Sequence, residues 1–340
     1  MTTARRVDAN GRTPPDVSVV IVSFNTRDVL RECLHTLEAG SSDVRHEVIV
    51  VDNASHDGSA EMVAAQSPAT TLIRSDANLG FAGASNRGLE VARGRYVVLL
   101  NSDAFLATGA LALSVKKMDA HPRVGLAGGR LVGRDGSWQP SGRLFPSITN
   151  DLLTLSGLAD RHPESRFFGR MDRTWADPLE PARVDWVPAA YSILRREVLD
   201  QVGPFDRRFF LYYEEVDLCR RVNEAGFEVW YWPDIVVVHV GGESARTVEN
   251  GGGVSRSGAQ LSLWRMRSAL LYYRKHHGRA GAATAMAIEA AWHRLRAWKN
   301  RHAADPVARA KAEESERLAD LMHRAWSETS GGAVSPSQPW

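Results

Sequence analysis

Polar side chains end three of the apolar segments in the first third of the chain. They are Ser23 and Asn25 after the first segment, Asp52 and Asn53 after the second, and Asn101, Ser102 and Asp103 after a later one. A polar residue at such a place can be a turn former or a helix cap. In an open parallel sheet, however, ligands bind at the carboxyl ends of the strands. Three such ends at one edge therefore favour a ligand site.

Asp103 carries the sharpest indication of chemistry among these residues. It ends the run YVVLLNSD (96–103), so its carboxylate is expected just outside a buried strand. Mg²⁺ or Mn²⁺ bound there could bridge to a diphosphate, because hard divalent ions take oxygen ligands and share them with phosphates. The alternative is that Asp103 caps the helix expected after Thr108.

A glycine-rich stretch, Asn78 to Gly88, opens a predicted helix and could let the backbone approach a phosphate or ribose. Its candidate contacts are Asn78, Gly80 and Asn86. It is not a dinucleotide-binding fingerprint, because those glycines belong directly after the first strand, where this chain has Asn25-Thr26-Arg27-Asp28.

The second half contains three acids, Glu214, Glu215 and Asp217, at a predicted helix start. Acids there also fit the helix dipole. The aromatic run before them, which includes Tyr213, is unusual for a cap, and aromatic walls raise a carboxylate's pKa toward that of a general base.

His239 ends a later apolar strand, IVVVHV, just before two glycines. A lone histidine is commonly structural, but at a strand end it is also a candidate metal ligand.

The elements that must position these residues follow from hydrophobic patterning. Strands are expected at 17–24, 47–53, 70–75, 96–103 and 124–132, with helices between them. This alternation predicts an α/β fold with a mostly parallel sheet flanked by helices. From 133 to about 182 the periodicity is lost, which indicates a long surface excursion.

Order returns from 185 to 240 with a strand, two helices and the segment VWYWPDIVVVHV (229–240). Two or three helices are then expected between 260 and about 326. The division predicted from these patterns is a polar tail (1–15), a catalytic domain (16–258, in halves 16–133 and 134–258), a basic amphipathic helical region (259–328) and a disordered tail (329–340).

Composition excludes several classes of protein. The 340 residues have a formal net charge of +2, which argues against a nucleic-acid coat. The two cysteines, Cys33 and Cys219, provide no disulfide framework, so a reducing, cytoplasmic compartment is expected. There is no signal-like apolar stretch at the N-terminus and no apolar run long enough to span a membrane.

Seven motifs, in order, resemble those of family 2 glycosyltransferases, and most closely the bacterial rhamnosyltransferase and galactofuranosyltransferase branch. They are VSVVIVSFN, VIVVDNASHDGS, NLGFAGASNRG, LLNSDA, WVPAAYSILRREVLDQVGPFD, FFLYYEEVDLCRR and HVGGES, covering about 16–244. The resemblance implies a GT-A fold, an inverting single displacement, and a nucleobase near Asp52 with the end of the first strand beside it.

The resemblance also implies roles for individual residues. Asp103 matches the last acid of the family's metal-binding Asp-x-Asp motif, and His239 a histidine that completes the metal site. Glu215 matches the acid that deprotonates the acceptor, with Glu214 beside it. Trp186 matches an aromatic position of the acceptor pocket, to which Tyr213 and Asp217 are also assigned.

Two positions depart from the family pattern. Asn101 replaces the first Asp of the motif, so it is expected to contact the nucleotide sugar. Glu215 replaces the commoner Asp, which leaves open whether Glu214 or Glu215 is the base.

Other activities are less compatible with the sequence. A sugar nucleotidyltransferase or a nicotinamide dehydrogenase needs a glycine-rich loop after the first strand, which is absent. A non-catalytic nucleotide-sugar-binding module remains an alternative. By family likeness alone the expected donor is dTDP-L-rhamnose, with a UDP-hexose or UDP-galactofuranose as its rival and a glycan or lipid-linked molecule as acceptor.

Nine basic residues and one acid, Glu289, lie between 260 and 301. Tryptophans, tyrosines and leucines are interleaved with them, including Trp264, Trp292 and Trp298. This pattern suits a peripheral helix on an anionic membrane, at its cytosolic face. The alternative is that these helices pack on the catalytic domain and expose a basic face.

Overall fold

The first half of the chain alternates strands and helices, because β-branched apolar runs alternate with amphipathic segments. The computed structural model describes residues 14–241 and 254–336. Its first elements are β1 (Val17–Ser23), α1 (Arg27–Gly40), β2 (His46–Asp52), α2 (Ser59–Gln66), β3 (Thr71–Arg74), α3 (Gly80–Val91), β4 (Tyr96–Asn101), β5 (Ala104–Leu106), α4 (Ala110–Ala120) and β6 (Val124–Val132).

The second half is less regular. It contains β7 (Trp138–Gln139), α5 (Ile148–Leu155), α6 (Leu158–Arg161), β8 (Ala182–Val184), β9 (Tyr191–Arg195), α7 (Arg196–Val202), α8 (Glu214–Glu224) and β10 (Glu228–His239). The excursion predicted from 133 to 182 therefore includes two short helices. They escaped the periodicity argument because they are short, with 8 and 4 residues.

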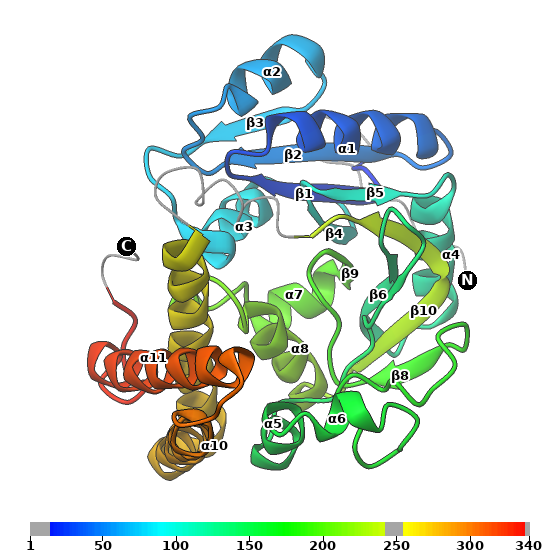
Figure 1. Ribbon diagram of the computed structural model, residues 1–340. Coiled ribbons are helices and arrows are strands. Elements are labelled where there is room, and N and C mark those ends of the chain that lie inside the picture. Colours follow the sequence, from blue (N-terminus) through cyan, green and yellow to red (C-terminus); the bar gives the residue numbers. More distant parts are fainter. Residues whose placement is uncertain (1–13, 242–253, 337–340) are drawn as a thin grey trace.

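The strands form one sheet in the order β3-β2-β1-β4-β9-β6-β10-β5, with β7 beside β6 and β8 beside β10 (Figure 1). The block β3-β2-β1-β4 is parallel, as is the pair β6–β10. The predicted mostly parallel α/β sheet is thus confirmed, with the antiparallel pairs confined to its second half. The chain reverses its direction across the sheet between β1 and β4, where open α/β sheets bind ligands.

Two apolar cores cover the two faces of the sheet. Alternate residues of β1 face opposite ways: Val19 and Ile21 pack with α1, α2 and α4, whereas Val20 packs on the other side with α3, α7 and α8. Cys33 and Cys219 are free thiols buried in α1 and α8, one in each core. The sheet is therefore a rigid platform for the loops at its edge.

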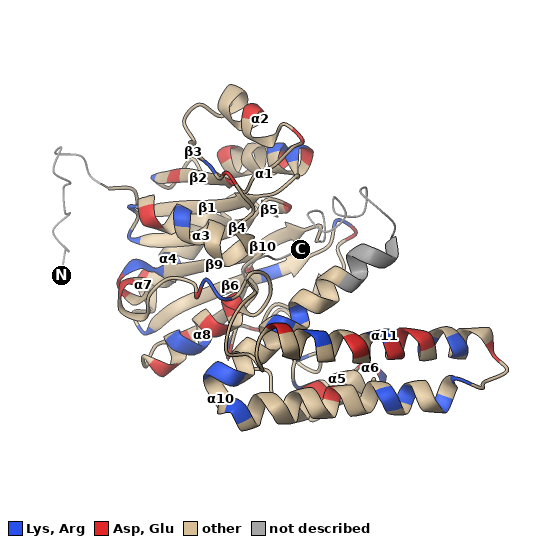
Figure 2. Cartoon of the chain, turned by 90° about the vertical axis from the view of Figure 1, so that its left-hand side faces the viewer, with Lys and Arg blue, Asp and Glu red and all other residues tan. Residues whose placement is uncertain are grey.

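Two long helices follow the sheet: α10 (Val254–Asn300), which bends at Gly278, and α11 (Pro306–Glu328). Figure 2 shows them side by side, projecting from the sheet as a hairpin. The first half of α10 packs against the sheet domain, so that Trp264, Leu271 and Tyr272 are buried. These residues, proposed above for a membrane face, are therefore unavailable to lipid.

The C-terminal segment 329–336 corrects another expectation. It was expected to be disordered, but its first residues turn back against α10: Thr329 is buried, and a Cβ on Gly332 would lie 2.2 Å from the carbonyl oxygen of Leu270. The expected tail at 1–13, the glycines at 251–253 and residues 337–340 lie outside the described residues. Among the described helices, none is long and apolar enough to cross a membrane.

Candidate functional site

The ends of β1, β2 and β4 lie side by side, as the strand register requires. Ser23 is aligned with Asp52 across the β1–β2 pair, and Val22 with Asn101 across β1–β4. The Thr26 hydroxyl lies 3.0 Å from the hydroxyls of both Ser23 and Ser102. The structure therefore brings together the polar strand ends that were predicted to form one edge.

Asn25 and Asp52 shape the loop after β2. Asn25 has a positive φ of 53°, and its side-chain oxygen accepts a hydrogen bond from the His56 N–H at 2.7 Å. One oxygen of Asp52 accepts from the Ser55 N–H at 3.2 Å, while the other is buried and has no hydrogen-bond partner among the described residues. A buried carboxylate oxygen in this state is suited to a ligand N–H.

The glycine-rich motif connects the end of β2 with the loop that precedes α8. The Asn53 amide donates to the Asn78 side-chain oxygen at 2.8 Å, and that oxygen also accepts from the Gly80 N–H at 2.9 Å. A Cβ on Gly80, which has φ +71°, would lie 2.2 Å from the carbonyl oxygen of Phe210. Gly80 is thus needed for close contact with the loop that leads to the acids.

The structure contradicts the predicted role of Asn86. This residue was predicted to contact the nucleotide sugar, but it is buried with both ends of its carboxamide hydrogen-bonded to the backbone of Phe205, at 2.8 and 3.0 Å. Binding a ligand would require breaking these two bonds. Its side chain instead anchors the segment that precedes the acids.

Asp103 and His239 meet because β5 and β10 pair antiparallel, with His239 opposite Ala104. The His239 Nε2 lies 3.5 Å from an Asp103 carboxylate oxygen. Asp103 does not cap α4, whose N-cap is Gly109. The two residues predicted to hold a metal are therefore neighbours.

Gln139 of β7 was missed by the sequence reasoning. Its side-chain oxygen lies 2.9 Å from His239 Nδ1, and its amide donates to the His239 carbonyl at 2.9 Å. If Nδ1 donates to Gln139, the lone pair of Nε2 is directed toward Asp103, as a metal ligand requires. No periodicity or family motif identified Gln139.

The pair fits a divalent cation that takes most of its ligands from elsewhere. Within the described residues, Asp103 and His239 do not belong to any group of three or more His, Cys, Asp or Glu that could hold a metal. Mg²⁺ and Mn²⁺ sites commonly combine few protein ligands with phosphate oxygens and water. One carboxylate and one imidazole suit such an ion beside a diphosphate.

The acids Glu214 and Glu215 begin α8 directly after a strained turn. Tyr212 and Tyr213 have φ values of 70° and 68°, in the left-handed region that residues other than glycine and asparagine seldom adopt. Such backbone is concentrated at functional sites. Each acid also has one buried oxygen with no hydrogen-bond partner among the described residues.

The two acids differ in their electrostatic environment. Burial raises the pKa of Glu214 well above its usual value, and the neighbouring Glu215 carboxylate raises it further. Burial also raises the pKa of Glu215, but backbone hydrogen bonding and the Arg143 guanidinium oppose that rise. Two adjacent carboxylates avoid ionising together, and because only the rise at Glu215 is opposed by a guanidinium, Glu215 is the more readily ionised of the two.

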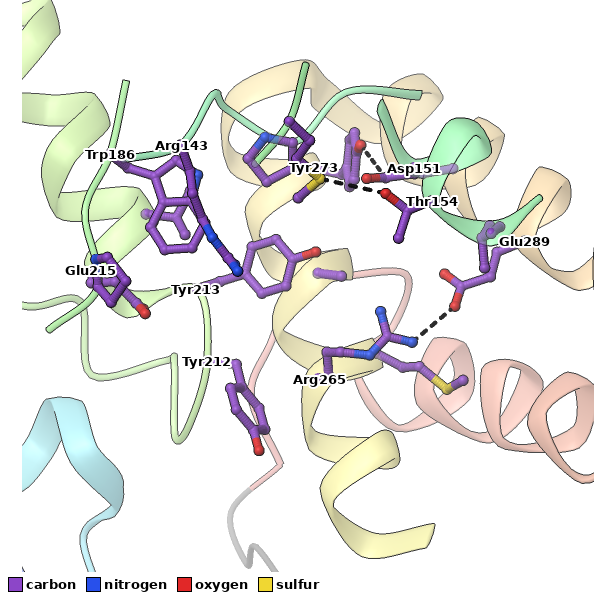
Figure 3. Close-up of a pocket in the computed structure, with 18 of the residues that line it drawn as sticks. Arg143, Asp151, Thr154, Trp186, Tyr212, Tyr213, Glu215, Arg265, Tyr273 and Glu289 are labelled. Carbon is purple, nitrogen blue, oxygen red and sulfur yellow. Dashed lines mark hydrogen bonds and ion pairs between the residues drawn. The ribbon is translucent and has the colours of Figure 1, made fainter. Parts of the chain in front are cut away.

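A cavity of about 440 Å³ lies beside Glu215, and Glu214 does not line it. Figure 3 shows Glu215 at one end, near Trp186 and Arg143, with Tyr213 between them and α10. His239 also lines this cavity. The candidate base and a candidate metal ligand therefore open on the same space.

Trp186 and Arg143 form one side of the cavity. The Trp186 indole N–H donates to the Leu144 carbonyl at 2.9 Å, and the Arg143 guanidinium lies 5.1 Å from the centre of the indole ring. Arg143 also forms an ion pair with Asp172 at 3.0 Å. Arg143 was not predicted, because it lies in the excursion that has no periodic pattern.

The structure also contradicts the predicted role of Asp217. Its side chain is 0% exposed and does not line the cavity, contrary to the predicted acceptor contact. It instead accepts hydrogen bonds from Arg221 at 2.9 Å and from His276 at 2.8 Å, and pairs with Lys275 at 2.7 Å. Asp217 therefore fastens α8 to α10.

Comparison with known proteins gives three relevant findings. The profile of "Glycosyl transferase family 2" matches residues 18–202. The N-acetylglucosaminyl-diphospho-decaprenol L-rhamnosyltransferase of Mycobacterium tuberculosis is 30% identical over 236 residues, which cover 65% of this chain and 75% of that protein. The succinoglycan biosynthesis protein ExoO of Rhizobium meliloti is 36% identical over 107 residues, 31% of this chain and 30% of its own length.

Among solved structures, the mannosyltransferase PcManGT from Pyrobaculum calidifontis, in complex with GDP-Man and Mn²⁺, has a similar fold. The TM-score is 0.52 at 21% identity, covering 93% of this chain and 88% of the other. At this identity the likeness concerns the fold alone, and it agrees with the GT-A arrangement expected from the sequence.

Proposed function

Because the chain belongs to glycosyl transferase family 2, in its rhamnosyltransferase-like branch, we propose that it transfers a sugar from a nucleotide diphosphate to an acceptor hydroxyl, with inversion. The observation that carries the proposal is the shared cavity of Glu215 and His239. A general base and a diphosphate-binding group on one cavity suit a single displacement at the anomeric carbon. The acceptor is a lipid-linked molecule or glycan of cell-surface polysaccharide synthesis.

The donor lies at the edge formed by β2, β1 and β4. The unpartnered oxygen of Asp52 is suited to accept from the imide N–H of thymine or uracil. Asn25 and Asn101 are the partly exposed side chains of this edge and would contact the sugar nucleotide. Ser23 and Ser102 are buried around the Thr26 hydroxyl, and Asn53 is buried with both ends of its carboxamide bonded, to Asn78 and to the Leu79 N–H, so these three support the edge from within. The 30% identity to a rhamnosyltransferase supports dTDP-L-rhamnose as donor, with UDP-hexose and UDP-galactofuranose as rivals.

Asp103 and His239 would hold Mg²⁺ or Mn²⁺ at the diphosphate. The ion would neutralise the leaving nucleoside diphosphate as a Lewis acid. The chain's own residues orient the site: Gln139 fixes the His239 ring, and the Thr26 hydroxyl links the ends of β1 and β4. Glu215 takes the proton of the acceptor hydroxyl, while Trp186 and Tyr213 pack against the acceptor.

Donor choice is tested by measuring release of nucleoside diphosphate. We expect dTDP-L-rhamnose to give faster release than UDP-glucose, UDP-galactofuranose or GDP-mannose, because the family likeness favours rhamnose, whereas the Asp52 oxygen suits thymine and uracil alike. Release should require Mn²⁺ or Mg²⁺. Strong preference for a UDP-sugar would reassign the donor, and release from none of them, with or without acceptor extract, would favour a binding module.

We also propose that the chain associates with an anionic membrane through the tip of the α10–α11 hairpin, residues 292–311. Leu295, Trp298 and Val307 are 55%, 64% and 60% exposed there. The tip contains six basic residues, Arg294, Arg296, Lys299, Arg301, Arg309 and Lys311, and one acid, Asp305. Exposed tryptophan amid basic side chains suits a membrane interface.

Membrane association is tested by sedimentation with liposomes. The full chain should pellet with anionic but not with neutral vesicles at low salt, since each basic residue near the surface adds about 1 kcal/mol. The double change Lys299→Glu/Arg301→Glu should abolish pelleting, whereas the matched change Lys116→Glu/Arg123→Glu, on the catalytic domain, should not. A wild-type chain that stays in the supernatant with both lipids contradicts the proposal.

A further inference from the structure

The cavity beside Glu215 has a second wall that comes from the C-terminal helices. We call it the helical wall: Met266, Ala269, Leu270, Ala285 and Met286 of α10 with Met322 of α11. These residues lie outside 18–202, the segment matched by the family profile. The helical wall is thus a part of the site that family membership does not explain.

The helical wall is apolar and adaptable. Ala269, Ala285 and Met286 are its partly exposed side chains, whereas Met266, Leu270 and Met322 are at most 2% exposed and form the packed layer behind them. The unbranched thioether of Met286 fits irregular apolar groups. Met171 and Leu155, from the excursion after β6, extend the same apolar surface. A saccharide alone would leave this surface poorly matched, whereas a hydrocarbon group would bury it.

The charged groups near the helical wall are already paired. Arg265 forms an ion pair with Glu289 at 3.1 Å, and Arg143 forms one with Asp172. Asp151 accepts a hydrogen bond from the Tyr273 hydroxyl at 2.5 Å. Both arginines that line the cavity in the described residues are therefore compensated by acids. A phosphate placed here would meet carboxylates as well as guanidinium groups.

We propose that the helical wall binds an uncharged, apolar group attached directly to the acceptor sugar whose hydroxyl faces Glu215. The inference rests on the proposed transferase function for the position of that sugar. It assigns acceptor selection to α10 and α11. In Figure 3 Tyr213 lies between Glu215 and the C-terminal helices. The sugar and the apolar group therefore occupy successive parts of one cavity.

The test measures binding to the full chain without donor, so that it is independent of transfer. The probes are octyl β-D-glucoside below its critical micelle concentration, glucose 1-phosphate and maltose, titrated by calorimetry. We expect octyl glucoside to bind at least about tenfold more tightly than either of the others, because only it buries methylenes on the helical wall. Equal or tighter binding of glucose 1-phosphate or maltose overturns the proposal.

Two variants on one helix locate the site. Ala285→Phe fills the cavity and should remove the preference for octyl glucoside, whereas Ala287→Phe, at an exposed position two residues away, should retain it. Met286→Gln, which keeps the side-chain length but adds an amide, should weaken octyl glucoside binding with little change in melting temperature. If both cavity variants retain the preference for octyl glucoside, the proposal is contradicted. Failure to release nucleoside diphosphate would instead contradict the proposed transferase function.

Discussion

Replacing Asp103 with alanine should lower kcat/KM by about 10³-fold or more, because charge neutralisation by a metal is worth several kcal/mol and each 1.36 kcal/mol is a factor of ten. In the part of the chain that the structure describes, the Asp103 carboxylate lies 3.5 Å from His239 Nε2 and makes no shorter side-chain hydrogen bond, so the fold should persist. Circular dichroism and Mn²⁺ binding, followed by electron paramagnetic resonance, separate a lost metal site from a lost fold.

Two further variants test whether the loss of activity depends on the metal site. Gln139→Leu removes the group that orients His239 and should cost about 10- to 100-fold in metal affinity. Asp200→Ala removes an exposed acid of α7 and should leave activity unchanged. Full activity of Asp103→Ala, or of the native chain in excess chelator, would show that the diphosphate is neutralised by other groups.

The sequence predicted the donor edge of this site well, for a simple reason. Strands such as 17–23 are nearly continuous runs of β-branched residues, and parallel topology brings their carboxyl ends to one edge. Once the strands were placed, the proximity of Ser23, Asp52 and Asn101 followed from register. What could not be predicted was which polar atoms the protein uses for itself, as the buried contact of Asn86 with Phe205 shows.

The acceptor side was predicted less completely. Arg143 and Gln139 come from a segment without periodicity, and their partners are distant in sequence. The Gln139 side chain contacts His239, 100 residues later, and Arg143 forms an isolated bridge with Trp186. The apolar residues of α10 were ambiguous, since the same pattern serves a membrane face or packing on a domain. The structure divides the helix: Trp264 is buried, and Trp298 is exposed.

Sequence also left the choice between Glu214 and Glu215 open. Adjacent helical residues point about 100° apart, so two neighbouring acids can lie in different surroundings. Of these two acids only Glu215 lines the cavity, while Glu214 is buried and its pKa is raised by that burial and by the Glu215 carboxylate. Glu214→Gln should accordingly retain most of the turnover. At a pH above the raised folded-state pKa of Glu214, the native chain holds a buried charge that the glutamine variant lacks, so the variant should have the higher melting temperature. At a pH below the pKa of glutamate in the unfolded chain, Glu214 is protonated in both states, and this advantage should disappear.

Glu215→Gln should reduce kcat by about 10²-fold or more, the typical contribution of a general base, while the affinity for the donor is spared. Burial raises the pKa of Glu215, so the native activity should fall as the pH drops through a value above that of an ordinary glutamate. Glutamine cannot lose a proton, and the residual activity of the variant should therefore lack this acidic limb. The two properties are measured together in a pH profile of kcat with saturating donor, alongside Glu214→Gln. If Glu214→Gln is instead the crippling change and Glu215→Gln keeps the acidic limb, the base is Glu214, and the acceptor must approach from outside the cavity.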